Sequence, residues 1–448
     1  MTAQRPASLL PGGERVATEV KLFTGRPEYA RSQLALGFRM TTADQASNLL
    51  HEQEGVESPI DLALKSVRTH LGMQVAYLSE FVENRSVFRG VDAPGLEHLI
   101  KVGDSQSLDD VYCRHIIEGR LPSLMPDTAA IPFAAAMPIT DAVPIGKHMS
   151  IPIRLADGEV FGMFCCLGPQ ADPSLNERDL QTMKVFADLV AHEVRRDVQS
   201  KRAHAAKIER MRQVIEQQQM STVYQPIFDL SNNRIAGYEC LTRFSAMPLR
   251  TPDVWFKEAG EIDRGTYLEI SAIALALRAL DHLPSNLYLG VNASPQTVVS
   301  SEFASTLEGV PLDRVVLEIT EHAEVADYDL LLWSMEALRE RGMRLAVDDA
   351  GAGYSGLQHI LKMKPDLIKL DLALTRNIDV DLSRRALTAA LVSFARATDS
   401  SIIAEGVETA EELAAIKSLG VQKAQGYFLG KPKPLADTLA ALKTGIAV

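Results

Sequence analysis

From residue 222 onward the chain repeats one pattern, in which a short apolar run is followed by a more polar segment. The eight runs cover residues 223–230, 235–244, 287–294, 315–320, 344–350, 366–371, 401–407 and 424–430. Seven of them are separated by enough sequence for helices, and strands that alternate with helices close into a (β/α)8 barrel. Only four residues, 231–234, separate the first two runs, which is too short for a crossover helix. We therefore expect an α/β fold with a TIM-like barrel whose first strand is antiparallel.

Acidic, amide or lysine side chains lie near the ends of seven consecutive runs, at the edge where such a barrel carries its active site. One polar strand end would indicate only a turn, but seven in succession indicate a site. The residues are Glu239, Asn292, Glu318, Glu321, Asp348, Asp349, Lys369, Glu405 and Gln425. Carboxylates that converge without a cation raise one another's pKa, and their oxygens suit Mg²⁺ or Mn²⁺. Two such ions suit phosphodiester hydrolysis, and a lysine can orient the attacking water.

The runs also carry motifs that resemble, in order, those of EAL domains, which linearise the bacterial messenger cyclic di-GMP. The run GYECLTR resembles the E-A-L-x-R signature, with Cys240 in place of alanine. The other motifs are YQPI at 224–227, VNASP at 291–295, LEITE at 317–321, VDDAGAGYSGL at 347–357, PDLIKLD at 365–371, AEGVET at 404–409 and QGYFLGKP at 425–432. The resemblance covers residues 218–445 and implies a cyclic-guanylate-specific phosphodiesterase that produces linear pGpG.

The resemblance implies a role for each matching residue. The implied ligands of two Mg²⁺ or Mn²⁺ ions are Glu239, Asn292, Glu318, Asp348, Asp349 and Glu405. Lys369, Glu405 and Glu239 are the implied catalytic groups, with Lys369 positioning the nucleophilic water. Gln225, Arg243 and Gln425 are the implied substrate-binding residues. Glu321 resembles the glutamate that anchors the loop after the fifth strand.

Two positions depart from the family pattern in that loop, where Ala350 and Ala352 replace a phenylalanine and a threonine. Loss of a buried aromatic side chain would remove about 1–3 kcal/mol of apolar contact. Every implied metal ligand is nevertheless present, which favours an active enzyme over the alternative, a silent cyclic di-GMP receptor that signals through protein partners.

The preceding segment divides into three parts. Residues 1–44 form an N-terminal extension that we expect to be partly disordered. Residues 45–178 resemble a GAF sensor domain of α+β type, in which Asp157-Gly158 lies between two β-rich runs and predicts a hairpin. Residues 179–220 predict a connecting helix, and 221–448 the EAL domain. The helix is either a coiled-coil stalk or a solvated connector, because Lys201 and Arg212 interrupt its apolar seam.

The ligand of the GAF-like part cannot be assigned from the sequence. Tyr112, Arg114, His115 and His148 are candidates for lining a small-molecule pocket, and Cys113 for attaching a chromophore. A buried structural thiol, or a domain that serves only dimerisation, fits the same residues.

Charge and cysteine usage restrict the partners. A net charge of −12 disfavours a nucleic-acid polymer or an anionic membrane surface. Four cysteines without a disulfide or zinc spacing suit a reducing cytosol. We expect a cytoplasmic homodimer that takes cyclic di-GMP as substrate and an unidentified small ligand in its GAF-like domain.

Overall fold

The computed structural model describes residues 58–320, 325, 327–350 and 356–444. The chain divides into two compact units, residues 1–194 and 195–448. The 40-residue helix α7 (Glu177–Glu216) begins in the first unit and ends in the second. Within the described residues, no helix is both long and apolar enough to cross a membrane.

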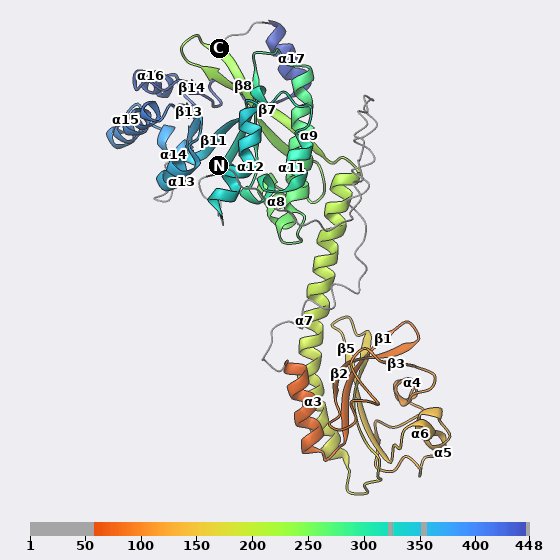
Figure 1. Cartoon of the computed structure of the whole chain (residues 1–448). Coiled ribbons are helices and arrows are strands. Elements are labelled where there is room, and N and C mark those ends of the chain that lie inside the picture. The colour runs from red at the N-terminus through yellow and green to blue at the C-terminus, as the bar shows by residue number, and fades with distance from the viewer. Residues whose placement is uncertain (1–57, 321–324, 326, 351–355, 445–448) are drawn as a thin grey trace, which may run out of the picture. The chain divides into compact units, whose positions relative to one another are not determined.

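The first unit is built on one antiparallel sheet with the strand order β3-β2-β1-β6-β5-β4 (Figure 1). Its strands are β1 (Val75–Val82), β2 (Arg85–Asp92), β3 (Ser105–Ser107), β4 (Leu124–Met125), β5 (Lys147–Arg154) and β6 (Val160–Gly168). Its helices besides α7 are α3 (Pro59–His70), α4 (Tyr112–Ile117), α5 (Pro132–Ala135) and α6 (Pro138–Ala142). Strands β5 and β6 form the hairpin that Asp157-Gly158 predicts, with Gly158 at φ +87°.

The two faces of this sheet are covered by different elements. Helix α3 packs closely on β2. A Cβ at Gly90 of β2 would lie only 2.9 Å from the side chain of Leu64 of α3. The other face contributes Tyr77 and Cys165 to an apolar cluster that also contains Cys113 of α4. Alternate residues of each strand therefore enter different cores, as the period of two requires.

The second unit is a closed barrel, and its first strand is reversed. Strands β8, β9, β10, β11, β12, β13 and β14 pair in parallel in that order. Strand β7 (Met220–Asp229) lies antiparallel to β8 (Arg234–Phe244) and closes the barrel by antiparallel pairing with β14 (Lys423–Ala424). The predicted barrel with one antiparallel strand is confirmed.

The remaining elements follow the strand–helix alternation. The strands are β9 (Tyr288–Asn292), β10 (Val315–Thr320), β11 (Arg344–Ala350), β12 (Leu367–Leu370), β13 (Ser401–Ala404) and β15 (Lys433–Pro434). The α-helices are α8 (Pro252–Gly260), α9 (Gly265–Leu277), α10 (Pro295–Val298), α11 (Ser301–Thr306), α12 (Tyr328–Glu340), α13 (Gly356–Met363), α14 (Leu372–Thr375), α15 (Leu382–Ala397), α16 (Ala410–Ser418) and α17 (Leu435–Thr444). Two 3-10 helices, η1 (Arg278–Asp281) and η2 (Leu312–Arg314), precede β9 and β10.

The prediction of a strand over 424–430 is wrong beyond Ala424. The chain turns after Gln425, and the amides of Leu429 and Gly430 donate to the carbonyl of Gly426 at 3.1 and 2.9 Å. A Cβ at Gly426 would lie 2.2 Å from the backbone of Val407, so the turn packs directly on the segment after β13. A second short strand, β15, instead pairs with β7.

The end of α7 is fixed to the second unit by packing and charge. Met211 and Val214 enter a cluster with Trp255 of α8, which has no exposed surface. The carboxylate of Glu258 accepts two hydrogen bonds from Arg210, at 3.0 and 2.7 Å, and one from Arg250 at 2.6 Å.

Candidate active site

The carboxyl ends of the parallel strands bring the predicted acidic residues together. Glu239 of β8, Glu318 of β10 and Asp348 of β11 each offer an oxygen atom within 4.8 Å of the others. A second group with the same spacing consists of Asp348, Asp349 and Glu405, so Asp348 belongs to both. The two groups meet because strands that run parallel end at one edge of the barrel.

Lys369 of β12 lies at the centre of this ring and has no exposed surface. Its Nζ lies 2.6 Å from Glu318 Oε2, 2.7 Å from Glu405 Oε1 and 3.1 Å from Asp348 Oδ2. The oxygen of Glu239 is 3.5 Å away. One ammonium therefore contacts carboxylates from four different strands or strand ends, which fixes their relative positions.

Gln425 joins two of these carboxylates directly. Its Nε2 donates to Glu239 Oε2 at 2.6 Å and to Glu405 Oε1 at 3.1 Å. The turn that follows Gln425 places this amide at the strand ends, and its own backbone amide donates to Ala404 at 2.9 Å. The Gln425 side chain, which follows β14, thus links Glu239 of β8 to Glu405 after β13.

A bulge in β11 presents two consecutive aspartates at the same end of the barrel. The pairing of β11 with β12 shifts between Val347 and Ala350. Asp349 has a φ of +59°, and its amide donates to Asp348 Oδ1 at 2.9 Å. A regular strand would point neighbouring side chains to opposite faces. The left-handed residue is a local strain of the kind that concentrates at functional sites.

Gly290 of β9 leaves the space that the Glu318 carboxylate occupies. A Cβ at this position would lie 2.1 Å from Glu318 Oε1. No motif in the sequence marks Gly290, because a glycine within a strand-like run carries no sign of which neighbour approaches it.

The loop after β9 has a further support that the sequence analysis missed. Glu269 of α9 accepts hydrogen bonds from the amide and the hydroxyl of Ser294, at 2.8 and 2.9 Å. Ser294 in turn caps α10 by accepting from Thr297 N. The Ser-Pro-x-Thr pattern at 294–297 could have indicated the cap, but Glu269 is distant in sequence.

Burial and mutual repulsion govern the protonation of the ring. Burial raises the pKa of Glu318 to about 8, and Glu239 and Asp348 raise it as well, whereas Lys369 lowers it. Burial also raises the pKa of Glu405, with Lys369 again opposing the shift. Burial alone would lower the pKa of Lys369, but the surrounding carboxylates hold it above its usual value. Fully ionised, the ring would carry more negative charge than its one lysine can balance, and the raised pKa values of Glu318 and Glu405 reflect this excess.

The donor set fits two divalent cations. With the five carboxylates of Glu239, Glu318, Asp348, Asp349 and Glu405 ionised, they and the ammonium of Lys369 carry a formal charge of −4, which two divalent ions would neutralise. Glu318 Oε1 is buried and has no hydrogen-bond partner among the described residues. An all-oxygen ligand set of this kind is typical of Mg²⁺ or Mn²⁺.

The other predicted residues border the ring or lie outside the described part. Asn292 ends β9 beside Glu318 of β10, and it is exposed. Gln225 is buried opposite Glu239 in the β7–β8 pair, and its amide donates to Gly430 O at 3.4 Å. Arg243 is exposed near the end of β8. Glu321 and Ala352 lie outside the described residues, whereas Ala350 is fully buried in the barrel core.

The candidate residues of the first unit are buried, except Arg114, which is half-buried. His148 is buried, and its ring lies edge-on to Tyr112 at 5.1 Å between centroids. His115 is buried beside Phe133, and Arg114 pairs with Asp109. Burial lowers the pKa of His148 to about 3. The Nδ1 atoms of both histidines lack a hydrogen-bond partner among the described residues.

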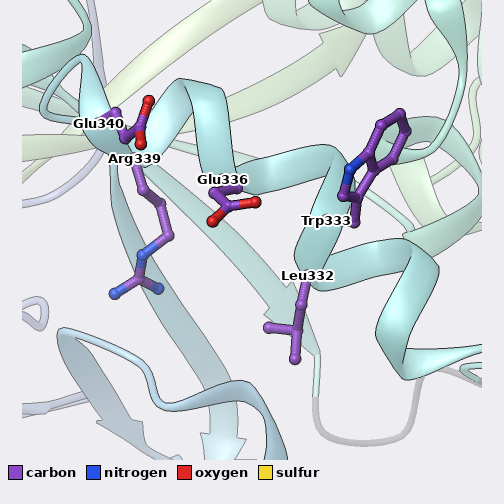
Figure 2. Close-up of a pocket in the computed structure, with 5 residues that line it drawn as sticks. All are labelled: Leu332, Trp333, Glu336, Arg339 and Glu340. Atoms are coloured by element: carbon purple, nitrogen blue, oxygen red, sulfur yellow. The ribbon is translucent and has the colours of Figure 1, made fainter. Parts of the chain in front are cut away.

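Outside the barrel, a hollow of about 460 Å³ follows a single helix (Figure 2). It is lined only by residues of α12, namely Leu332, Trp333, Glu336, Arg339 and Glu340. Because one helix supplies the whole lining, this hollow is part of the outer surface and takes no part in the ring.

Comparison with known families assigns both parts of the chain. The EAL domain family model matches residues 208–432, and the GAF domain family model matches residues 56–194.

Among curated proteins, the cyclic di-GMP phosphodiesterase NbdA of Pseudomonas aeruginosa is 30% identical over 51% of this chain and 31% of its own length. The probable cyclic di-GMP phosphodiesterase PdeA of Escherichia coli is 27% identical over 42% of this chain and 27% of its own length. The chain thus spans less than a third of the length of these two relatives.

Among solved structures, the EAL enzyme Bd1971 in its cAMP- and cyclic-di-GMP-bound form is 18% identical, with a TM-score of 0.51. The match covers 83% of this chain and 93% of that one, and at this identity it supports the fold alone.

Proposed function

Because the chain belongs to the EAL domain family, we propose that it hydrolyses cyclic di-GMP to linear pGpG in a metal-dependent reaction regulated by its GAF domain. The observation that carries the proposal is the ring of five carboxylates, four of which lie within 3.5 Å of the Lys369 ammonium. A barrel without this chemistry would have no reason to bury so much unbalanced negative charge.

In the proposed site, Glu239, Asn292, Glu318 and Asp348 would hold one Mg²⁺ or Mn²⁺ ion, and Asp348, Asp349 and Glu405 would hold the second. When bound, the ions would lower the pKa of an attacking water and neutralise the charge of the scissile phosphodiester. The −4 formal charge of the ring supports this stoichiometry, since it matches two divalent ions.

The chain's own residues position the reactants. Lys369 orients the water and offers a positive charge to the phosphate as its charge develops. Glu405 lies 2.7 Å from Lys369 and takes the proton that the water loses. Gln425 holds Glu405 and Glu239 in place by hydrogen bonds to both. Arg243, exposed near the end of β8, and Gln225, which lies opposite Glu239, bind the substrate's phosphates and guanine rim.

Regulation is proposed to pass from the GAF domain to the barrel through α7 in a homodimer. One continuous helix from Glu177 to Glu216 supports this route, because its last turns are tied to α8 by Glu258. The buried, unpartnered Nδ1 atoms of His115 and His148 favour a polar small ligand in the GAF domain. Four buried cysteines without a disulfide support work in the reducing cytoplasm.

The test is incubation of the purified chain with cyclic di-GMP and Mg²⁺ or Mn²⁺, with pGpG measured by chromatography. We expect turnover in the wild-type protein and none in Glu239→Ala, which removes one oxygen ligand and the partner of Gln425. A control, Glu302→Ala, changes an acidic residue of α11 that lies outside the ring. Binding of cyclic di-GMP without pGpG in the wild-type protein would instead identify a receptor.

A further inference from the structure

The end of the barrel opposite the carboxylate ring contains a separate hollow of about 420 Å³. Arg234, Tyr288, Arg344 and Lys423 are the first residues of β8, β9, β11 and β14, and all four line it. Asp229, the last residue of the reversed strand β7, lies beside them. Because parallel strands begin at one edge and end at the other, this hollow is the N-terminal mouth of the barrel.

The charged lining of this mouth is cationic, although the whole chain carries a net charge of −12. Four positive residues face two negative ones, which gives a formal charge of +2. They are Arg234, Arg314, Arg344 and Lys423 against Asp229 and Asp313. A local excess of positive charge in an acidic protein needs a structural or a binding explanation.

Structural pairing explains Arg314 and Asp229 but not the other cations. Arg314 donates to the backbone carbonyls of residues 280, 283, 284 and 287 at 2.9–3.1 Å, and Asp229 accepts from the amide and hydroxyl of Ser231. Within the described ranges, no carboxylate forms an ion pair within 4.0 Å of Arg234, Arg344 or Lys423.

Two of the three cations, Lys423 and Arg344, lie close together and are partly removed from solvent. Burial lowers the pKa of Lys423, Arg344 lowers it further, and Asp229 opposes the shift. The guanidinium of Arg344 on β11 lies 4.5 Å from the centroid of the Tyr288 ring on β9. This contact holds the guanidinium in position. Like charges that are brought together and partly removed from water favour a bound anion between them.

We propose that the N-terminal mouth of the barrel binds a small phosphate-bearing anion between Arg344, Lys423 and Arg234. An arginine fork and a lysine provide the directed donors and the point charge that phosphate oxygens require. Free phosphate and the phosphate of a nucleotide share this chemistry, and a hollow of about 420 Å³ has room for either. The site is separate from the carboxylate ring, which repels anions when no divalent ion is bound.

Calorimetric titration of the full chain with inorganic phosphate tests the proposal. The buffer contains EDTA to remove divalent ions from the ring, and chloride keeps the ionic strength constant. Arg344→Gln and Lys423→Gln should each weaken binding by roughly tenfold or more, because each removes a charge-assisted contact. Arg234→Gln repeats the test at an exposed position, where the substitution does not disturb the packing of buried side chains. The exposed Lys433→Gln on β15 is the control for a lost positive charge and should bind as the wild type does.

The outcomes separate this mouth from the active site. Unchanged affinity in all three mouth variants would overturn the proposal, as would the absence of any measurable heat in the wild-type protein. Loss of binding in Arg243→Gln, with the mouth variants unaffected, would place the phosphate at the active site instead. A second titration with guanosine 5′-monophosphate distinguishes the sources, since tighter binding than phosphate assigns the site to a nucleotide and equal binding assigns it to free phosphate.

Discussion

Replacement of Lys369 by methionine should separate the two contributions of this residue, to stability and to turnover. The change removes the ammonium that lies within 3.5 Å of four carboxylates and leaves a side chain of similar length. With the four carboxylates ionised, the formal charge of the site then changes from −3 to −4, and Lys369 and Glu318 are both buried. Breaking a buried ion pair costs about 3–5 kcal/mol, and protonation of Glu318 and Glu405 recovers part of this loss. We expect a loss of about 3 kcal/mol in EDTA.

Equilibrium unfolding in urea, followed by tryptophan fluorescence, measures this loss. Both tryptophans of the chain, Trp255 and Trp333, lie in the barrel unit, and only Trp255 is buried, so its emission reports on the barrel. The exposed Lys257→Met on α8 serves as the control. Mn²⁺ should stabilise Lys369→Met more than it stabilises the wild-type protein. Turnover should fall by roughly 10²–10³-fold while cyclic di-GMP still binds. If the variant matched Lys257→Met in stability and hydrolysed cyclic di-GMP at the wild-type rate, Lys369 would neither stabilise the ring nor contribute to turnover.

Three further changes test other parts of the chain. Gly290→Ala should lower turnover by roughly 10²-fold, because its Cβ would lie 2.1 Å from Glu318 Oε1, whereas Gly260→Ala, with open space around it, should not. His148 has a folded pKa of about 3, below the unfolded value of 6.5, so its contribution to stability is complete above pH 6.5 and is lost as the pH falls. Calorimetry should show the GAF transition about 1.4 kcal/mol less stable at pH 5.5 than at pH 7.5, and His148→Gln should reduce this dependence. Glu258→Ala should cost about 2 kcal/mol in urea unfolding, because two arginines lose their acceptor.

For each of these three substitutions, a different outcome would contradict the structural explanation given for it. Equal kinetics in the Gly290 and Gly260 variants would mean that the Glu318 carboxylate adjusts without loss. A GAF transition with the same pH dependence in the wild type and His148→Gln would mean that His148 does not control it. Unchanged urea unfolding in Glu258→Ala would mean that α7 is held by its apolar contacts alone.

The main elements of the site could be predicted from the sequence because each follows a run of apolar residues within a strand. Glu239, Glu318 and Asp348 each end an apolar run, and parallel strands of a barrel must end at one edge. The antiparallel orientation of β7 followed from the four-residue link to β8, which is too short for a crossover helix.

Other features depended on contacts between segments far apart in the chain. The sequence around Gly290 does not show that this residue contacts Glu318. That contact is visible only in the folded barrel. The last predicted strand ends at Ala424, because Gly426 turns on the backbone of Val407. Arg344 and Lys423 are far apart in the sequence, and only the closed barrel places them around the same hollow.

The sequence by itself therefore determined the barrel, its reversed strand and the acidic residues at one edge of it, since periodicity, link length and strand ends are local properties. Tertiary structure decided the contacts among these residues: that Lys369 meets four carboxylates, that the bulge at Asp349 turns two neighbouring aspartates to the same end, and that Gln425 joins Glu239 to Glu405. The physical reason is that distances between strands depend on barrel closure and register, which local sequence patterns do not contain.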